Sequence, residues 1–441
     1  MILDVNESSL SEIKNPALRE YAGKYVGIYQ DFMAQISQMG LEVETEDTSA
    51  QAAQKVADFN GKGPLVRNGG KSIYTNRISP SCQACQTGIG STTFFISLKC
   101  HRDCFYCFNP NQQDYEYHRE HTRNTIAELD ALRAANPDTR HVALTGGEPL
   151  LFKDETYRFF EHAGQLFPAA HTRLYTSGDH IDRETLESLQ KSGLKEIRFS
   201  IRMHDLAGGH RHTYDRIALA REYIPNVMVE MPVLPNTLPE MKEVLLELDR
   251  LGIFGVNLLE LCFPLNNPEV FRAKGYKIKA RPFRVLYDYW YAGGLPIAGS
   301  ETVCLDLIEF AAQAGLKLGV HYCSLENKHT GQVYQQNCGH RLPKRMYFSQ
   351  QDYFLKSAKV FGDDIPRVQK IFEKNGYRDY QINSQINFLE FHPSQISSLK
   401  KLDLEIGISS SVIEMRENDQ FLRELKVDVT TPQTFRLSKD V

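Results

Sequence analysis

The sequence predicts an α/β protein built around a parallel β-sheet, and three observations support this prediction. From residue 91 to about residue 324, short runs rich in β-branched and aromatic residues alternate with longer runs whose apolar residues recur at helical spacing. Some of the short runs, such as Val227–Leu234, are almost continuously apolar, as expected of strands buried on both faces. Glycine-rich and cysteine-rich motifs follow strands directly, at the edge where ligands bind in such sheets.

Seven strands and six intervening helices are expected in this region. The predicted strands are residues 91–99, 140–145, 171–176, 196–202, 226–234, 254–261 and 317–323. The predicted helices are residues 123–135, 154–167, 182–192, 213–223, 238–251 and 301–315. Because a helix follows every strand except the last, the region forms at least six βα units.

Two further regions flank the sheet. Residues 1–90 are expected to form an N-terminal helical extension, because apolar residues recur at helical spacing over residues 9–38. We expect this helix to pack on the main domain. After residue 324 the alternation of strand-like and helix-like runs stops, and the pattern of residues 325–441 predicts a small α+β domain. The predicted domains are therefore residues 1–90, 91–324 and 325–441.

The composition argues against some classes of partner. Lys and Arg number 51 against 55 Asp and Glu, and the net charge of −4 gives no electrostatic reason to expect binding to nucleic acid or to an anionic membrane. The sequence has no apolar run of about 18 residues that would predict a membrane span. Its nine cysteines are grouped, which favours metal ligation in a reducing compartment over disulfides. We therefore expect a cytoplasmic protein.

Three cysteines follow the first predicted strand at C-x3-C-x2-C spacing: Cys100, Cys104 and Cys107. Three thiolates from one short loop can ligate three irons of a [4Fe–4S] cluster and leave the fourth iron open. The alternative is a structural zinc site. Zinc normally completes a tetrahedron with four ligands in paired C-x2-C units, so three cysteines at this spacing fit it poorly.

A second motif, Gly146-Gly147-Glu148-Pro149, follows the second strand. Consecutive glycines allow the backbone to approach a ligand closely, and the Glu148 carboxylate could hold a cationic group. Together with the three-cysteine loop and the aromatic Tyr106 beside its last cysteine, this motif resembles the signature of the radical S-adenosylmethionine (SAM) superfamily.

The resemblance implies a partial (β/α)6 barrel in which the open iron binds the amino and carboxylate groups of SAM and the reduced cluster cleaves SAM to a 5′-deoxyadenosyl radical. It implies that the Gly-Gly-Glu-Pro element contacts the SAM amino group. Strand-end residues are the further candidates for binding the ribose, the carboxylate and the adenine: Thr176, Ser177, Ser200, Arg202 and Val233. Tyr106, between two cysteines of the loop, is the other candidate for contact with the adenine. The alternative for the strand-end side chains is a role in local hydrogen bonds.

A second set of cysteines flanks the predicted barrel: Cys82, Cys85, Cys323 and Cys338. Four thiolates suffice for a zinc site or an auxiliary iron–sulfur cluster. The arrangement, with its His-Tyr-Cys-Ser run, resembles a poorly characterised subgroup of radical SAM proteins. The alternatives are separate free thiols, or a histidine, His321 or His340, in place of one cysteine.

Two cysteines remain. Cys304 lies in a predicted amphipathic helix and is expected to be part of the core. Cys262 follows the sixth strand, on the side of the expected active site, where a thiol could give a hydrogen atom to a substrate radical. The alternative for Cys262 is a buried small residue.

These features predict a radical SAM enzyme that is reduced by flavodoxin or ferredoxin and abstracts hydrogen from a substrate. A peptide or protein side chain is the favoured substrate, because additional metal sites beside the barrel recur in peptide-modifying relatives. A small metabolite or tRNA is the alternative within this class. From another class, the chain could be a non-catalytic metal-binding scaffold, but both motifs are intact, which argues against this alternative.

Overall fold

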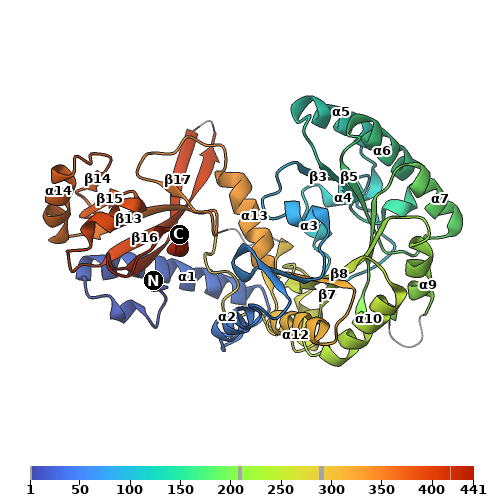
Figure 1. Ribbon diagram of the computed structural model, residues 1–441, viewed down its shortest axis with the longest axis horizontal. Coiled ribbons are helices and arrows are strands. Elements are labelled where there is room, and N and C mark those ends of the chain that lie inside the picture. The colour runs from blue at the N-terminus through green and yellow to red at the C-terminus, as the bar shows by residue number, and fades with distance from the viewer. Residues whose placement is uncertain (1, 207–210, 288–292, 418) are drawn as a thin grey trace. The chain divides into compact units, whose positions relative to one another are not determined.

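The computed structural model of the 441-residue chain describes residues 2–206, 211–287, 293–417 and 419–441. The chain folds into two compact units (Figure 1). The parallel-sheet unit comprises residues 40–282 and 289–329, and the antiparallel-sheet unit comprises residues 1–39, 283–288 and 330–441.

Seven strands of the parallel-sheet unit lie side by side in sequence order, each parallel to the next. They are β3 (Ser91–Phe95), β4 (His141–Thr145), β5 (His171–Thr176), β6 (Glu196–Ser200), β7 (Asn226–Val233), β8 (Gly255–Glu260) and β11 (Gly319–Cys323). The predicted α/β fold is confirmed, because all seven predicted strands are present with bounds that differ by a few residues.

Helices connect these strands and cover the outer side of the sheet (Figure 1). The six predicted helices are α5 (Thr125–Ala135), α6 (Lys153–Leu166), α7 (Arg183–Lys191), α9 (Arg211–Ala220), α10 (Leu238–Leu251) and α12 (Ser300–Gln313). Alternate strand residues such as Leu144, Phe199 and Val229 point into one apolar core with these helices. The other strand residues line an inner face that is largely polar, where the short helix α3 (Pro80–Ala84) lies.

Shorter elements complete the parallel-sheet unit. They are α2 (Ser49–Asp58), α4 (Tyr115–Glu120), α8 (Met203–Leu206), α11 (Pro268–Ala273) and the two-residue strands β9 (Cys262–Phe263) and β10 (Leu295–Pro296). Helix α13 (Leu325–Asn337) follows β11 and continues into the other unit. Within the described ranges, none of the helices combines the length and the apolar character that a membrane-spanning segment requires.

The N-terminal 90 residues differ from the predicted helical extension. Strands β1 (Leu65–Arg67) and β2 (Ser72–Thr75) form a hairpin, and β2 pairs antiparallel with β11, which extends the sheet to nine strands. The first long helix, α1 (Pro16–Gln38), belongs to the antiparallel-sheet unit. Leu18 and Tyr21 of α1 are buried in a core cluster with residues of the antiparallel sheet. The apolar stripe of the helix therefore packs on this sheet.

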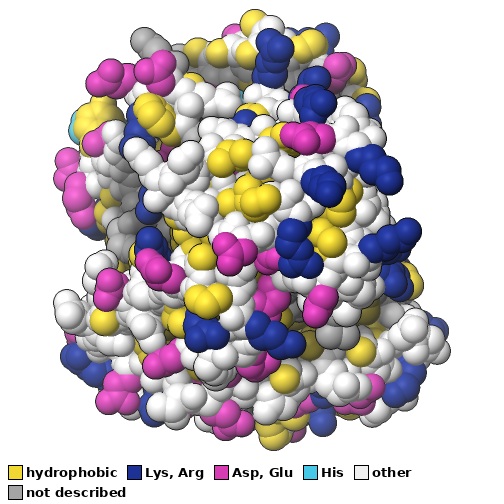
Figure 2. All heavy atoms as spheres, turned by 90° about the vertical axis from the view of Figure 1, so that its left-hand side faces the viewer, with side chains coloured by type: hydrophobic (Ala, Val, Ile, Leu, Met, Phe, Trp, Pro, Cys, Tyr) yellow, Lys and Arg dark blue, Asp and Glu magenta, His cyan; other side chains and the backbone are white. Residues whose placement is uncertain are grey.

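The antiparallel-sheet unit contains the predicted C-terminal α+β domain. Its strands run in the order β14 (Gln381–Asn383), β15 (Phe388–Phe391), β13 (Leu355–Phe361), β16 (Ile406–Arg416) and β17 (Asp419–Thr430), and β12 (Tyr347–Phe348) also pairs with β13. Helix α14 (Asp364–Lys374) buries Val368 and Phe372 against this sheet. On the face in Figure 2, basic and acidic side chains are interspersed, which accords with the small net charge.

Candidate active site

The cluster loop, residues 100–107, lies beyond the carboxyl end of β3. Cys100 is exposed, and Cys104 and Cys107 are half-buried. Burial raises the pKa of all three thiols, that of Cys107 to about 11. Within the part of the chain that the structure describes, no three His, Cys, Asp or Glu side chains gather closely enough for a single metal ion. A [4Fe–4S] cluster binds each thiolate through a different iron, and the three-cysteine ligand set stays a prediction.

Arg102, inside the cluster loop, ties the loop to the ends of two other strands. Its Nε and Nη2 donate to the two carboxylate oxygens of Asp179, at 2.6 and 2.8 Å, and its Nη1 donates to Asp205 at 2.8 Å. Asp179 follows β5 and Asp205 lies in α8, just after β6. Burial alone would raise the pKa of Asp179, but Arg102 and His101 hold it well below its usual range.

We refer to Arg102, Asp179 and Asp205 as the arginine clamp. Only 8% of the Arg102 side chain is exposed, so the bidentate pair is largely shielded from water. Sequence reasoning missed the clamp, because an arginine between two cysteines carries no signal for the distant aspartates that hold it.

The Gly-Gly-Glu-Pro turn packs directly on the segment that leads into the cluster loop. The backbone N–H of Gly147 donates to the Ser97 carbonyl at 3.0 Å, and that of Glu148 donates to the Lys99 carbonyl at 2.9 Å. A Cβ on Gly147 would lie 1.9 Å from the Lys99 oxygen, and one on Gly146 would lie 2.6 Å from the Ser97 oxygen. The glycines are therefore required for contact between the two loops, a reason that differs from the predicted approach to a ligand.

The carboxylate of Glu148 joins this turn to the end of β5. It is 2% exposed and accepts hydrogen bonds from the Thr176 hydroxyl at 2.8 Å and from the Ser177 N–H at 2.7 Å. Its negative charge also contributes to the raised pKa of Cys100, which places it near the cluster loop. Three of the predicted SAM-binding residues are thus brought together.

The remaining predicted SAM-binding residues lie at or near the same edge. Ser200 is exposed at the end of β6, and Arg202 donates from Nη2 to Asp205 at 2.8 Å. Val233 is buried at the end of β7, and its carbonyl accepts from the Ser300 hydroxyl at 2.7 Å. Burial raises the pKa of Tyr106 well above its usual value. Their contacts to SAM stay predictions.

Three of the four flanking cysteines belong to the parallel-sheet unit. Cys82, in α3, and Cys323, at the end of β11, are buried, and Cys85 is exposed. The negative charges of Cys85 and Cys82 contribute to the raised pKa of Cys323, so these three thiols are electrostatic neighbours.

Cys338 belongs to the other unit. Helix α13 begins two residues after Cys323 and ends immediately before Cys338. At 1.5 Å per residue, the intact helix keeps the backbones of these two cysteines about 20 Å apart. This separation does not fit the predicted four-cysteine site, because all ligands of one site must reach the same ion or cluster.

The two remaining cysteines differ from each other. Cys304 is fully buried in α12 as part of the apolar core, as predicted. Cys262 lies in β9 after β8, and burial raises the pKa of its thiol to about 11. The Cys107 thiolate adds to that shift, which indicates that Cys262 lies near the cluster loop.

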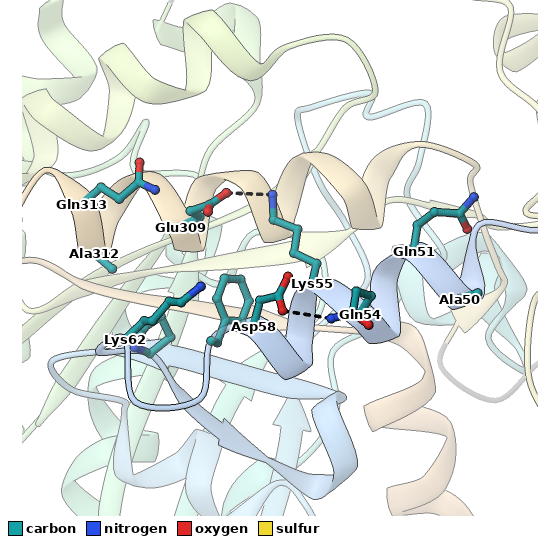
Figure 3. Close-up of a pocket in the computed structure, with 11 residues that line it drawn as sticks. Ala50, Gln51, Gln54, Lys55, Asp58, Lys62, Glu309, Ala312 and Gln313 are labelled. Atoms are coloured by element: carbon teal, nitrogen blue, oxygen red, sulfur yellow. Dashed lines mark hydrogen bonds and ion pairs between the residues drawn. The ribbon is translucent and has the colours of Figure 1, made fainter.

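A separate cavity of about 700 Å³ lies between α2 and α12 (Figure 3). Lys55 reaches across it to Glu309 at 3.0 Å. Helix α12 starts at Ser300, whose hydroxyl is hydrogen-bonded at the carboxyl ends of β7 and β8. From there the helix runs towards the amino ends of the strands. The cavity is lined by the last residues of this helix, so it lies at the opposite edge of the sheet from the cluster loop.

Comparisons with known proteins match the region that carries these motifs. Residues 94–248, from β3 into α10, match the sequence model of the radical SAM superfamily. The protein MJ0021 of Methanocaldococcus jannaschii, provisionally named a glycyl-radical enzyme activating enzyme, is 26% identical over 375 residues, covering 81% of this chain and 94% of that protein.

Solved structures are matched only in part. Streptococcus suis SuiB bound to its precursor peptide SuiA aligns with 72% of this chain and 66% of its own, at 15% identity and a TM-score of 0.39. The radical SAM methyltransferase TsrM from Kitasatospora setae aligns with 42% of this chain and 39% of its own, at 16% identity and a TM-score of 0.32. The chain thus spans two thirds or less of these structures. On the sequence match, residues 94–248 form a radical SAM superfamily domain, for which a [4Fe–4S] cluster and SAM are implied, and the chain is an enzyme.

Proposed function

We propose that this enzyme cleaves SAM reductively at a [4Fe–4S] cluster held by Cys100, Cys104 and Cys107, and that the 5′-deoxyadenosyl radical abstracts hydrogen from a protein or peptide. One observation carries the proposal: the Gly-Gly-Glu-Pro turn is hydrogen-bonded to Ser97 and Lys99, in the segment that leads directly into the cluster loop, at the carboxyl edge of the parallel sheet. Three soft thiolates on one accessible loop fit the donor set of such a cluster. When bound, the cluster supplies the electron and an open iron.

The protein's own residues would position SAM and the loop. The arginine clamp fixes the cluster loop against the ends of β5 and β6. Glu148, oriented by Thr176 and Ser177, is the acceptor proposed for the SAM amino group. Arg202 and Ser200 are proposed to bind the carboxylate and the ribose, while Tyr106 and the backbone at Val233 are proposed to flank the adenine.

Cys262 is proposed to return a hydrogen atom to the substrate radical, which would leave a thiyl radical on Cys262; one electron from the proposed flavodoxin or ferredoxin and one proton would restore the thiol. Its raised pKa keeps the group as a thiol at neutral pH, and only the thiol carries the hydrogen atom to be given. Replacing Cys262 with Ala should leave 5′-deoxyadenosine formation intact and reduce the yield of closed-shell product. Unchanged product formation would remove the proposed role.

A protein substrate is supported by the similarity to the M. jannaschii protein, whose provisional name describes the activation of another enzyme. We propose flavodoxin or ferredoxin as the electron donor, in the cytoplasm. A second metal site at the flanking cysteines is also part of the proposal.

Transfer of deuterium tests the substrate class. A cell extract from the source organism, grown in deuterated medium, is separated into proteins, RNA and small molecules, and each fraction is given to the reduced enzyme with unlabelled SAM. Because the abstracted atom moves to the 5′ carbon, deuterium in 5′-deoxyadenosine identifies the fraction that holds the substrate. Label from the protein fraction is expected. Label only from small molecules or RNA would contradict the proposed substrate.

A further inference from the structure

We infer that the inner face of the parallel sheet holds a second iron–sulfur cluster, bound by Cys82, Cys85 and Cys323 without Cys338. The inference deepens the proposed function, on which it rests, because it names the ligands and the kind of metal group at the second site. All three cysteines lie in the parallel-sheet unit, and four sets of contacts and charges support the assignment.

The sulfur of Cys82 is surrounded by hydrogen-bond donors. It accepts from Arg198 Nη2 at 3.1 Å and from Asn257 Nδ2 at 3.4 Å. The sulfur of a neutral thiol is only a weak acceptor, whereas a thiolate accepts such bonds and binds soft metals. Hydrogen bonds to ligand sulfurs are also one of the means by which proteins set cluster potentials. The site is therefore arranged for a thiolate.

These donors are themselves held in place. Arg198 is 2% exposed and bonds to Glu196 at 2.6 Å and to Glu230 at 2.7 Å. The Asn257 amide also donates to Glu230 at 2.8 Å. This network of buried ion pairs and hydrogen bonds fixes the donors that face Cys82, as the residues that hydrogen-bond to metal ligands do in metal sites.

Helix α3 presents Cys82 and Cys85 one turn apart, on one side of the helix. The helix is anchored on the inner face by the Ser79 hydroxyl, which donates to Glu196 at 2.6 Å. Cys323, the last residue of β11, accepts from Asn327 Nδ2 at 3.5 Å. A second buried sulfur is thus provided with an amide donor.

Three cationic groups, Arg198, Arg173 and Lys328, act on these sulfurs, and the carboxylate of Glu230 lies near all three of them. Arg173 is 8% exposed, and its Nε is buried with no hydrogen-bond partner in the described part of the chain. Its charge acts on both Cys82 and Cys85, and Lys328 acts on Cys85 and Cys323. The Arg173 guanidinium lies over the Tyr175 ring at 5.0 Å, and an anionic thiolate-bound cluster would add negative charge beside its unbonded Nε.

The number of thiolates favours a cluster over zinc. A closed zinc site needs four protein ligands, and the helix between Cys323 and Cys338 removes the fourth predicted cysteine. His321 does not replace it, because its Nε2 is hydrogen-bonded to Ser72 at 2.9 Å and its Nδ1 to Asn257 at 2.5 Å. Three thiolates can ligate three irons of a [4Fe–4S] cluster, as predicted for the cluster loop of the same chain.

The test uses the full chain with Cys100, Cys104 and Cys107 all replaced by Ala, so that the first cluster is removed. After anaerobic reconstitution with ferrous iron and sulfide, this variant should retain about four iron and four sulfide per chain. Adding Cys323→Ala should remove them, whereas adding Cys338→Ala, or Cys304→Ala as the matched core control, should not. An absence of iron in the triple variant, one zinc in its place, or loss of iron with Cys338→Ala would overturn the inference.

If the triple variant does not fold, iron is counted instead in the wild-type protein and in the single Cys323→Ala variant. The unchanged protein should bind about eight irons, and the Cys323→Ala variant about four. Equal counts would contradict the second cluster. The second cluster and the cleavage of SAM can be contradicted separately. If the triple variant kept four irons but the wild-type protein made no 5′-deoxyadenosine, the proposed function would be wrong and the second cluster would still be supported.

Discussion

The two sets of cysteines in the parallel-sheet unit differ in how the fold prepares their sulfurs. In the cluster loop, backbone N–H groups donate to the sulfurs, such as that of Arg102 onto Cys100 at 3.4 Å, and burial raises the pKa of all three thiols. On the inner face, Cys82 faces a guanidinium and an amide. Burial alone would raise its pKa, but Arg198 and His321 lower it to about 6.

This difference accords with the two clusters that we propose. The loop cysteines stand at an accessible edge, where a bound cluster can meet SAM, and depend on the metal to replace their protons. On the inner face, the buried Cys82 and Cys323 accept from fixed donors, which suits a group that stays in place, whereas Cys85 is exposed.

Removing a loop ligand should have the largest effect. In the Cys104→Ala variant, formation of 5′-deoxyadenosine should fall to the level of a reaction without enzyme, because the cluster loses one of its three protein ligands. The product is measured by chromatography under anaerobic conditions, with Cys304→Ala as the control. If Cys104→Ala retained the activity of unchanged protein, Cys104 would not be a ligand.

A methyl group on Gly147 should displace the cluster loop. The Cβ would lie 1.9 Å from the Lys99 oxygen, a backbone atom that no side-chain rotation can move away. Gly147→Ala should therefore cost about 4 kcal/mol or more of unfolding free energy and lower the iron content of the loop site. Urea unfolding and iron analysis check both effects.

The matched control is Gly164, an exposed position in α6 where a Cβ would meet nothing within 4 Å. Gly164→Ala should stabilise the protein by about 0.5–1 kcal/mol, because alanine favours the helix interior. Equal stability of the two variants would show that the contact between the Gly-Gly-Glu-Pro turn and the cluster loop is not tight.

Breaking the arginine clamp should have a smaller effect. Arg102→Gln removes the bidentate partner of Asp179 and one of the two arginines on Asp205, at a cost of about 3 kcal/mol, and should also lower cluster retention at the loop. The exposed pair Arg119–Glu116 is the control, and Arg119→Gln should change stability by less than about 0.5 kcal/mol. Comparable losses in both variants would mean that the clamp does not position the loop.

Hydrophobic periodicity was sufficient to predict the parallel sheet. Strands buried on both faces and amphipathic helices such as α10 carry local patterns, so their bounds follow from the sequence. The short strands β1 and β2 have no such pattern, because their pairing with β11 joins residues about 250 positions apart. The apolar stripe of α1 predicts that one face of the helix is buried, but it does not indicate which part of the protein packs against that face. The packing of α1 on the antiparallel sheet was therefore not predicted.

The candidate site was predictable where its chemistry is local in sequence. The spacing of Cys100, Cys104 and Cys107 and the Gly-Gly-Glu-Pro motif needed no structure. The bond of Glu148 to Thr176, the arginine clamp and the donors around Cys82 depend on which strands are neighbours. No single-sequence pattern records such contacts.

The most direct test of the central claim is reductive cleavage of SAM by the purified chain. Anaerobically reconstituted protein with SAM and dithionite should form 5′-deoxyadenosine and methionine in equal amounts, and only when the reductant is present. A full [4Fe–4S] absorption spectrum without any 5′-deoxyadenosine would contradict the assignment of this chain as a SAM-cleaving enzyme.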